Sequence, residues 1–407
     1  MGKITVLSPV HISSGNVYLS ICIHENKRYS FSDVLKTSRD SMIFLDDNIN
    51  NVLLRKDITV SKKQLFDKLN LDFQKLESKT PLYSVINKTE KNNLVNNINE
   101  NIKNLSTPYI PGSTLKGYVS NVLWHDIFLE NQEINKYYSN HFKETYKKIN
   151  SGNSKDEYKH LKNLNKKISD ITNELKGIMQ LVGFHDVIFQ DSSISIYESN
   201  RYLNGKKASK TIPIGSVEVI DEGETSESKF LFTGLEISRD YMNRIKKGME
   251  EEIDKSKNKD RLSDNVFHYQ KRIKHLILNE IYKRILDFKN WFPKANKRFM
   301  LEVIKKELEF LDNSDNNEID SNSLREYLDS VKMNIEKDEI ILQIGKFTNF
   351  FAKSYGNAFG ELYREYFTEF FSPDPKKKTV PKIDTMNLIV KNGMGTTPFG
   401  FIRIDEL

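Results

Sequence analysis

The chain changes character sharply at Tyr109-Ile110-Pro111-Gly112-Ser113-Thr114-Leu115-Lys116-Gly117. An apolar segment ends at Ile110, and apolar residues then recur at helical steps, namely Leu115, Val119, Val122, Leu123 and Ile127. Pro111 fixes φ and cannot continue a strand ladder, while Gly112 tolerates dihedral angles that other residues avoid. The stretch therefore predicts a strand, a tight turn and a helix, with Ser113 or Thr114 as the N-terminal cap.

The charges of the predicted helix point to an anion at its start. Its first turn holds Lys116, and the first acidic side chain after it is Asp126, although a helix dipole favours acidic residues there. A lysine beside free N–H groups and two hydroxyls suits an external anion such as phosphate. An ordinary turn with a solvated lysine explains the same residues, and the motif alone leaves both interpretations open.

The composition bounds the class of protein. A chain of 407 residues has room for about two or three domains, and its net charge of +6 is compatible with a polyanionic partner. The one cysteine, Cys22, permits no intramolecular disulfide and is expected to be a packed residue. No secretory signal and no apolar run of transmembrane length is visible. We expect a soluble cytoplasmic protein with no membrane partner.

The patterns along the chain favour an α+β fold, a sheet core carrying two large helical insertions. The expected units are residues 1–130, with the strand–turn–helix element, a helical insertion at 131–179, core β-hairpins at 180–238, a second helical insertion at 239–339, and a C-terminal part of the core at 340–407. Strands are expected at 3–7, 17–24, 42–45, 181–189, 193–197, 213–220, 229–237 and 387–404, and helices at 61–76, 90–104, 239–253, 266–291, 298–311, 324–335 and 347–371.

A second glycine-containing stretch, Asn392-Gly393-Met394-Gly395-Thr396-Thr397-Pro398-Phe399-Gly400, follows Lys391. Closely spaced glycines let a backbone approach a ligand and present its N–H groups. The spacing matches neither the dinucleotide fingerprint nor the Walker motif, which disfavours a nucleotide-binding fold. A plain flexible loop before the last strand remains the alternative.

Two patterns suggest enzymes. Ser113 and Lys116 form an S-x-x-K, and Ser263-Asp264-Asn265 an S-D-N, as in serine β-lactamases, but the chain contains no Lys-Thr-Gly. The dyads His125-Asp126 and His185-Asp186 lack further histidines at metal-ligand spacing, so we interpret them as surface or core pairs.

Three segments together resemble the RAMP superfamily of CRISPR–Cas proteins: Ser8-Pro9-Val10-His11-Ile12-Ser13-Ser14-Gly15, the stretch 109–117, and Ile341-Leu342-Gln343-Ile344-Gly345-Lys346 before the glycine-containing end. Within it, they are similar to the subunit that caps the backbone filament of type III-A (Csm) effector complexes. The resemblance implies an RRM-like (ferredoxin-like) core that holds guide RNA by its backbone. It also implies a place at the 3′ end of the CRISPR RNA, and support of 3′-end maturation through nucleases recruited from outside.

The resemblance carries residue-level expectations. It implies an RNA-binding, non-catalytic subunit without a cofactor or metal, whose partners are CRISPR RNA, neighbouring backbone and small subunits, and host nucleases. The residues expected to bind RNA are His11, Ser13, Ser14, Gly112, Ser113, Thr114, Lys116, Lys391, Gly393 and Gly395. Ser13 stands where the family pattern often has glycine.

Three alternatives to that role stay open. Related backbone subunits cut target RNA with a loop aspartate and Mg²⁺, and nothing in the sequence singles out one of Asp33, Asp40, Asp46 and Asp47 for that role. A metal-dependent ribonuclease, a serine hydrolase using Ser113 and Lys116, and a purely structural adaptor therefore remain.

Overall fold

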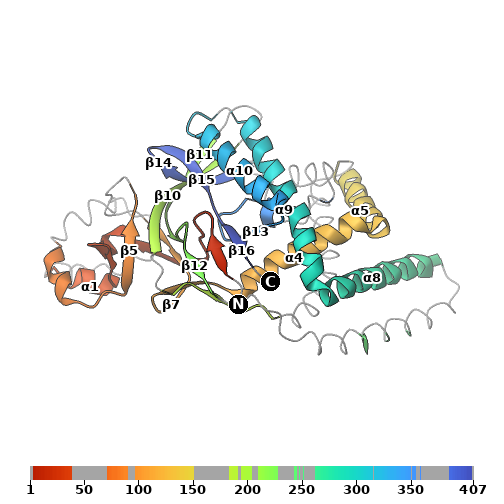
Figure 1. Ribbon diagram of the computed structural model, residues 1–407, viewed down its shortest axis with the longest axis horizontal. Coiled ribbons are helices and arrows are strands. Elements are labelled where there is room, and N and C mark those ends of the chain that lie inside the picture. The colour runs from red at the N-terminus through yellow and green to blue at the C-terminus, as the bar shows by residue number, and fades with distance from the viewer. Residues whose placement is uncertain are drawn as a thin grey trace.

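The computed structural model describes most of the sheets and helices of the chain. The described residues are 3–38, 71–89, 97–150, 183–190, 194–203, 210–227, 243, 244, 247, 251, 262–314, 316–349, 351–353, 358 and 385–405. Figure 1 shows strands in the middle of the molecule, with α1 and β5 at one end and α5 and α8 at the other.

The smaller sheet joins parts of the chain that are far apart in sequence. Its four antiparallel strands follow the order β12-β1-β16-β13 (Figure 1). They are β1 (Ile4–Val6), β12 (Thr225–Ser226), β13 (Ile340–Gln343) and β16 (Phe401–Ile404). Ile4 lies opposite Ile404, which lies opposite Ile340 on its other side. β16 is therefore paired on both sides, and it joins β13 to the rest of the sheet.

The larger sheet is mixed and contains nine strands. They are β2 (Ser13–Leu19), β3 (Ile23–His24), β4 (Lys27–Arg28), β5 (Tyr83–Asn87), β6 (Asn97–Asn101), β10 (Ile194–Leu203), β11 (Lys210–Ile220), β14 (Thr385–Lys391) and β15 (Met394–Pro398). The first half of β10 pairs in parallel with β5, and its second half pairs antiparallel with β14. This fork splits the sheet into two arms, and it places Arg201 of β10 opposite Asn387 of β14.

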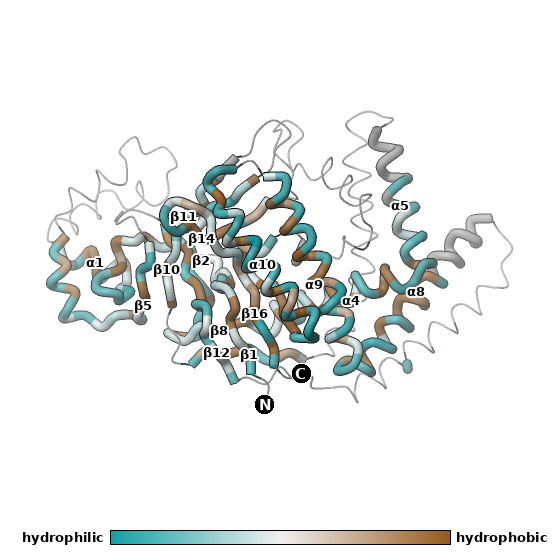
Figure 2. Tube along the Cα trace, turned by 45° about the horizontal axis from the view of Figure 1, so that its top comes forward, coloured by the Kyte–Doolittle hydropathy of each residue, from teal (hydrophilic) through white to brown (hydrophobic). Residues whose placement is uncertain are grey.

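Most helices pack against one another, and α9 and α10 also contact strands, whereas α1 packs on η1 and η2. The helices are α1 (Phe31–Leu35), α4 (Gly112–Glu130), α5 (Gln132–Asn150), α8 (Leu262–Leu286), α9 (Phe288–Asp312) and α10 (Ser321–Glu336), with 3₁₀ turns η1 (Ser20–Cys22), η2 (Phe73–Ser78) and η3 (Phe351–Lys353). α9 packs on β13 and α4, and α10 packs on α9 and β15. Apolar and polar residues alternate along α9 and α10 (Figure 2), as amphipathic helices require.

A buried carboxylate ties three helices together. Asp126 of α4 is 2% exposed and accepts hydrogen bonds from Arg284 Nε of α8 at 2.7 Å and Trp291 Nε1 of α9 at 2.9 Å. Arg298 of α9 also contacts it. Because a buried charge is costly unless it is paired and hydrogen-bonded, this cluster fixes α8 and α9 against α4.

Several expectations are confirmed. The strand–turn–helix element is present as β8 (Thr107–Ile110) followed by α4, and β8 lies between β7 (Lys103–Asn104) and β9 (Val187–Ile188). Helices stand at 298–311 and 324–335, and Cys22 is a buried free cysteine. The fold is a mixed arrangement of helices and sheet, as expected. No helix in the described ranges combines the length and apolar character needed to cross a bilayer.

Other expectations are wrong. The described part of 90–104 holds strands β6 and β7 instead of a helix, because β2 and β11 supply ladder partners to an asparagine-rich segment with little propensity of its own. The strand expected at 17–24 is interrupted by η1, and only Val187–Ile188 of 181–189 is a strand. The helix expected across 266–291 breaks at Asp287, whose ψ of 34° is not helical. The elements expected at 42–45, 229–237 and most of 61–76, 239–253 and 347–371 lie outside the described residues.

Candidate nucleic-acid interface

The start of α4 is capped by a residue distant in sequence. Gly112 N donates to Asp186 Oδ1 at 2.8 Å, and neither Ser113 nor Thr114 caps the helix with its side chain. The expected cap is therefore wrong, because a carboxylate from the segment before β9 takes the place that the hydroxyls were expected to fill. A Cβ on Gly112 would lie 2.1 Å from Phe184 O. Gly112 is thus needed for the close approach of that segment.

The rest of the turn remains accessible. Ser113 is exposed, and Lys116 is partly buried and makes no ion pair with any carboxylate of the described chain. Partial desolvation lowers the pKa of Lys116 from its usual value. Asp186 supplies one negative charge beside Gly112 N, and Thr114 N and Leu115 N donate to Pro111 O. Lys116 and the Ser113 N–H are therefore what this end of the helix still offers to an anion.

The segment of residues 8–15, which we call the first loop, is fixed by the buried His11. Its Nδ1 donates to Glu218 O at 2.7 Å, and its ring stacks on Phe347 with centroids 4.8 Å apart. Burial lowers the pKa of His11 to about 4, so the imidazole is neutral at physiological pH. His11 O accepts from Lys346 N at 2.9 Å. Gly345 allows this approach with φ of +114°, since a Cβ there would lie 2.7 Å from the same oxygen.

A third segment completes this arrangement. Gly400, with φ of +90°, donates from its N–H to Pro9 O at 3.0 Å and accepts at its carbonyl from Ile344 N at 2.8 Å. Phe401 N donates to Ser8 Oγ at 2.9 Å. Residues 8–13, 343–347 and 399–401 therefore form one unit, which we call the three-segment junction.

Three cations gather beside this junction. Lys346 Nζ donates to Ser13 Oγ at 3.2 Å, Arg201 Nε donates to Asn387 Oδ1 at 2.9 Å, and Lys353 donates to Lys346 O. None of the three forms an ion pair with a carboxylate in the described part of the chain. We call Arg201, Lys346 and Lys353 the cationic cluster.

The pKa of Lys353 is lowered first by burial and then by the neighbouring charges. Its side chain reaches solvent, yet surrounding protein and the nearby Arg201 and Lys346 lower its pKa to about 8. Positive charge without a neutralising carboxylate is the electrostatic signature of an anion-binding surface. Sequence reasoning missed this cluster. Lys346 was visible after the glycine of the Ile341–Lys346 motif, whereas nothing in the sequence connects Arg201 with Lys353.

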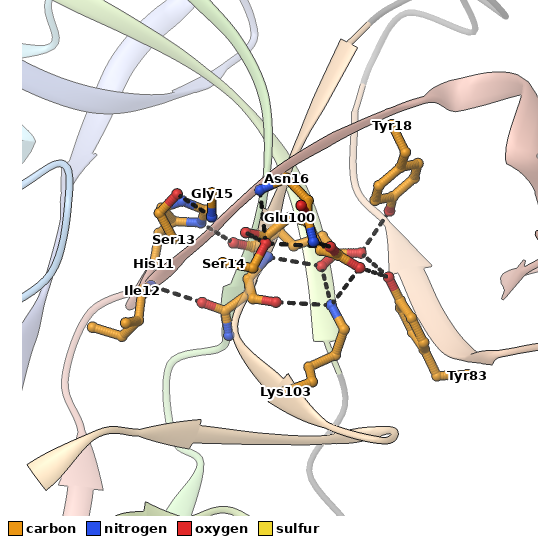
Figure 3. A network of polar contacts seen from close by, with 12 residues as sticks. His11, Ile12, Ser13, Ser14, Gly15, Asn16, Tyr18, Tyr83, Glu100 and Lys103 are labelled. Atoms are coloured by element: carbon orange, nitrogen blue, oxygen red, sulfur yellow. Dashed lines mark hydrogen bonds and ion pairs between the residues drawn. The ribbon is translucent and has the colours of Figure 1, made fainter.

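The two serines of the first loop face different partners. Ser13 contacts Lys346, whereas Ser14 Oγ donates to Glu100 Oε2 at 3.2 Å and Asn16 Nδ2 donates to the same oxygen at 3.0 Å (Figure 3). A phosphate is attracted toward Lys346 and repelled from Glu100. The geometry therefore favours Ser13 over Ser14 as a neighbour of an RNA backbone, although both remain predictions as RNA contacts.

A second buried carboxylate holds the strands behind the loop. Glu218 of β11 has no exposed surface and accepts from Tyr18 OH at 2.5 Å, Tyr83 OH at 2.8 Å, Asn101 N at 3.0 Å and Lys103 Nζ at 2.5 Å. These donors come from β2, β5, β6 and β7. Figure 3 shows Tyr18, Tyr83 and Lys103 converging from different elements. The network thereby fixes β2, the strand that begins at Ser13 in the first loop.

The three-segment junction is also hydrogen-bonded to α9. Glu307 is 1% exposed and accepts at Oε1 from Gln343 Nε2 at 2.9 Å and Asn349 Nδ2 at 2.7 Å. Burial raises the pKa of Glu307 to about 7. Asn387 Nδ2 donates to Phe347 O at 2.9 Å, which links the junction to β14.

The glycine-containing turn near the C-terminal strand divides into two environments. Lys391 and Gly393 are exposed at the β14–β15 turn, where Gly393 has φ of +76°. Gly395 is buried, and a Cβ there would lie 2.7 Å from the Tyr202 ring. Gly395 thus allows the ring to pack. Lys391 is four residues along β14 from Asn387, roughly 13 Å from the partner of Arg201, so it does not join the cluster.

The residues considered as catalytic candidates lie in separate environments in the structure. Ser113 has no hydrogen-bond partner in the described chain that would act as a base. His125 is buried beside Phe299, and Asp126 belongs to the buried ion-pair cluster. Asp33 accepts from Ser30 Oγ at 2.6 Å in the cap of α1. Asp40, Asp46 and Asp47 lie outside the described residues.

Comparison with known proteins defines the class. The family model of the RAMP superfamily matches residues 3–352, and the chain belongs to that superfamily. None of the curated proteins compared with it matches.

Two solved structures have folds similar to that of this chain. One chain of a cryo-EM structure of a type III-A Csm–crRNA–target RNA ternary complex is similar at 17% identity and a TM-score of 0.55, covering 99% of this chain and all of that chain. Csm5 of T. onnurineus, seen in a crystal structure, has 16% identity and a TM-score of 0.46 over 99% of this chain and 100% of its own.

Proposed function

We propose that this chain is an RNA-binding subunit of a type III-A CRISPR effector complex, where it holds the 3′ part of the CRISPR RNA by its backbone. Its membership of the RAMP superfamily supports the class, and its fold similarity to a chain of a Csm–crRNA–target RNA complex supports the setting. The observation that carries the proposal is the cationic cluster beside the three-segment junction. Its positive charges are suited to binding RNA phosphates, and such contacts do not depend on the base sequence of the RNA.

The finer parts of the role belong to the same proposal. The chain caps the backbone filament and supports 3′-end maturation by nucleases recruited from outside, in the cytoplasm, and is not itself catalytic. Its core is RRM-like, divided into the units 1–130, 131–179, 180–238, 239–339 and 340–407. The antiparallel four-stranded sheet backed by α9 is the part that an RRM-like core would supply. Neighbouring backbone and small subunits are the proposed protein partners.

The test compares two pairs of lysines. Lys346→Ala with Lys353→Ala removes two charges from the cluster, and Lys289→Ala with Lys305→Ala removes two exposed charges from α9. RNA affinity is measured by fluorescence anisotropy at several salt concentrations, with a CRISPR RNA and an unrelated RNA of equal length. Loss of two phosphate contacts lowers the slope of log K against log salt by about 1.4. We expect that change in the first pair only, and equally for both RNAs.

Two results would contradict the proposal. Equal weakening by both pairs would reduce the cluster to general surface charge. A loss confined to the CRISPR RNA would indicate base recognition. Lys116→Ala tests the start of α4 in the same assay, where loss of one contact lowers the slope by about 0.7.

The non-catalytic role has its own test. If Ser113 were a nucleophile, Ser113→Ala would abolish catalysis by many orders of magnitude. If it only lies near phosphate, the same change removes one hydrogen bond and weakens RNA binding several-fold. We expect no labelling by an acylating probe and no metal-dependent RNA cleavage. Labelling at Ser113, or cleavage that depends on one aspartate among Asp33, Asp40, Asp46 and Asp47, would overturn this part.

A further inference from the structure

A second group of potential ligand side chains lies at the end of the molecule that holds α1, in the β3–β4 hairpin and η2 (Figure 1). His24 ends β3, Glu25 follows it in the turn, and Glu77 lies in η2. Each offers one ligand atom, an imidazole nitrogen or a carboxylate oxygen, and these atoms all lie within 4.8 Å of one another. Around one ion with bonds of about 2.1 Å, neighbouring ligand atoms are roughly 3–4 Å apart. Small side-chain rotations would therefore bring all three into one coordination shell.

The two elements that supply these ligands are held together by a ring contact. His24 stacks on Phe73, with centroids 5.5 Å apart and planes inclined by 19°. Phe73 begins η2, the element that carries Glu77, and it packs on the apolar cluster that contains Val34 and Leu76. The imidazole is thus oriented before any ligand binds. Such preorganisation reduces the entropy lost on binding.

The carboxylates of the group are not neutralised by the protein. Neither Glu25 nor Glu77 forms a hydrogen bond or ion pair through its side chain with another described residue. The other closely placed carboxylates differ, since Glu100 and Glu218 both contact Lys103 and hydroxyl donors. Two like charges brought together without a cation repel each other, and a dication removes that repulsion.

We propose that His24, Glu25 and Glu77 bind one divalent transition-metal ion of the Zn²⁺ or Mn²⁺ type. The imidazole nitrogen favours such ions over Mg²⁺ and Ca²⁺, which take oxygen ligands. Three protein ligands leave further positions for water. The ion would join the β3–β4 hairpin to η2, so its binding stabilises this end of the molecule. The site is independent of the proposed RNA-binding surface.

The test uses the full chain, stripped with chelator and titrated with Zn²⁺ alone and Mn²⁺ alone by isothermal calorimetry. We expect one equivalent of either ion to bind, and at least a tenfold loss of affinity in His24→Gln and in Glu77→Gln. His185→Gln is the matched control, because His185 is exposed beside Asp186 and no third ligand atom from the described residues completes a group there. A rise in melting temperature with metal is expected in the wild type and in His185→Gln, and is expected to be absent in His24→Gln.

Circular dichroism of the metal-free variants separates loss of ligands from loss of fold. If the variants are folded and bind as the wild type does, or if the wild type binds neither ion, the site does not exist. Loss of affinity in His185→Gln equal to that in His24→Gln would also overturn the proposal. Because no RNA is present in these measurements, their failure leaves the proposed RNA-binding role untouched.

Discussion

Lys353 is a cation that the protein itself makes easier to deprotonate. Its ammonium lies near Arg201 and Lys346, and the three charges have no carboxylate partner in the described chain. Like charges gathered without compensation store electrostatic repulsion that a polyanion relieves. The same reasoning explains why Lys103, which is paired with the buried Glu218, is not expected to contribute to RNA binding.

The first prediction follows from the pKa of about 8 for Lys353. Between pH 7 and pH 9 the ammonium loses its proton, so RNA affinity should fall several-fold across that interval beyond the change caused by other groups. Lys353→Arg keeps the charge throughout and should remove this component. Anisotropy titrations at pH 7, 8 and 9 measure it. An unchanged pH profile in Lys353→Arg would show that Lys353 does not contact the RNA.

The second prediction concerns Glu307 beneath the three-segment junction. Its pKa is about 7 in the folded chain against an ordinary 4.5, so between these values the folded state holds a proton that the unfolded state has released. Stability should therefore fall as pH rises from 4.5 to 7, by up to about 3 kcal/mol. Glu307→Gln should remove this fall, which urea unfolding at several pH values measures. Glu302→Gln, in the same helix, is the control and should keep the wild-type profile.

The turn before α4 shows how an element depends on a neighbour remote in sequence. Asp186, 74 positions away, caps the helix, and Phe184 lies against Gly112. The helix was predictable because its apolar spacing and the Pro-Gly break are local. Its cap was not, because no local pattern reveals that a distant loop will deliver a carboxylate to Gly112 N.

The third prediction contrasts two glycines of this element. A Cβ on Gly112 would lie 2.1 Å from Phe184 O, so Gly112→Ala must displace that segment and should destabilise the fold by roughly 1–3 kcal/mol. Gly117 has no atom within 4 Å of its Cβ position and lies inside α4. Gly117→Ala should therefore stabilise by about 0.5–1 kcal/mol. Chemical denaturation measures both. Equal effects of the two changes would contradict the packing described for Gly112.

The segment that holds β6 was wrongly expected to be a helix for a related reason. β6 is asparagine-rich, and only its pairing with β2 and β11 makes it a strand. Likewise, the sequence placed Ser13 and Ser14 together as one motif, while the fold turns Ser13 toward Lys346 and Ser14 toward Glu100. Contacts of this kind depend on the register of strands across the sheet. Local propensity contains no information about that register.

The molecule as a whole separates a sheet region from projecting helices. Figure 1 shows α5 and α8 extending away from both sheets, while the cationic cluster and the three-segment junction belong to the sheet region. α5 packs on α4 and α8. This separation supports assigning RNA binding to the sheets and subunit contacts to the helices.

The fourth prediction tests that division. Replacing residues 155–179, which lie outside the described residues, by a short linker should leave a folded core and RNA affinity within about twofold of the wild type. Incorporation into the effector complex, measured by co-purification after co-expression, should fall several-fold. A variant that assembles normally but no longer binds RNA would reverse the assignment.

The pairing of β1 with β16 has a consequence for protein synthesis. Phe401 N reaches Ser8 Oγ across 393 positions of the chain, and β16 lies between β1 and β13. During translation both neighbours emerge from the ribosome long before β16, and each then presents an unpaired edge. Closing so long a loop is slow, and exposed edges invite aggregation meanwhile. Nascent chains halted before residue 401 should therefore depend on chaperones, and emergence of β16 from the ribosome should end that dependence.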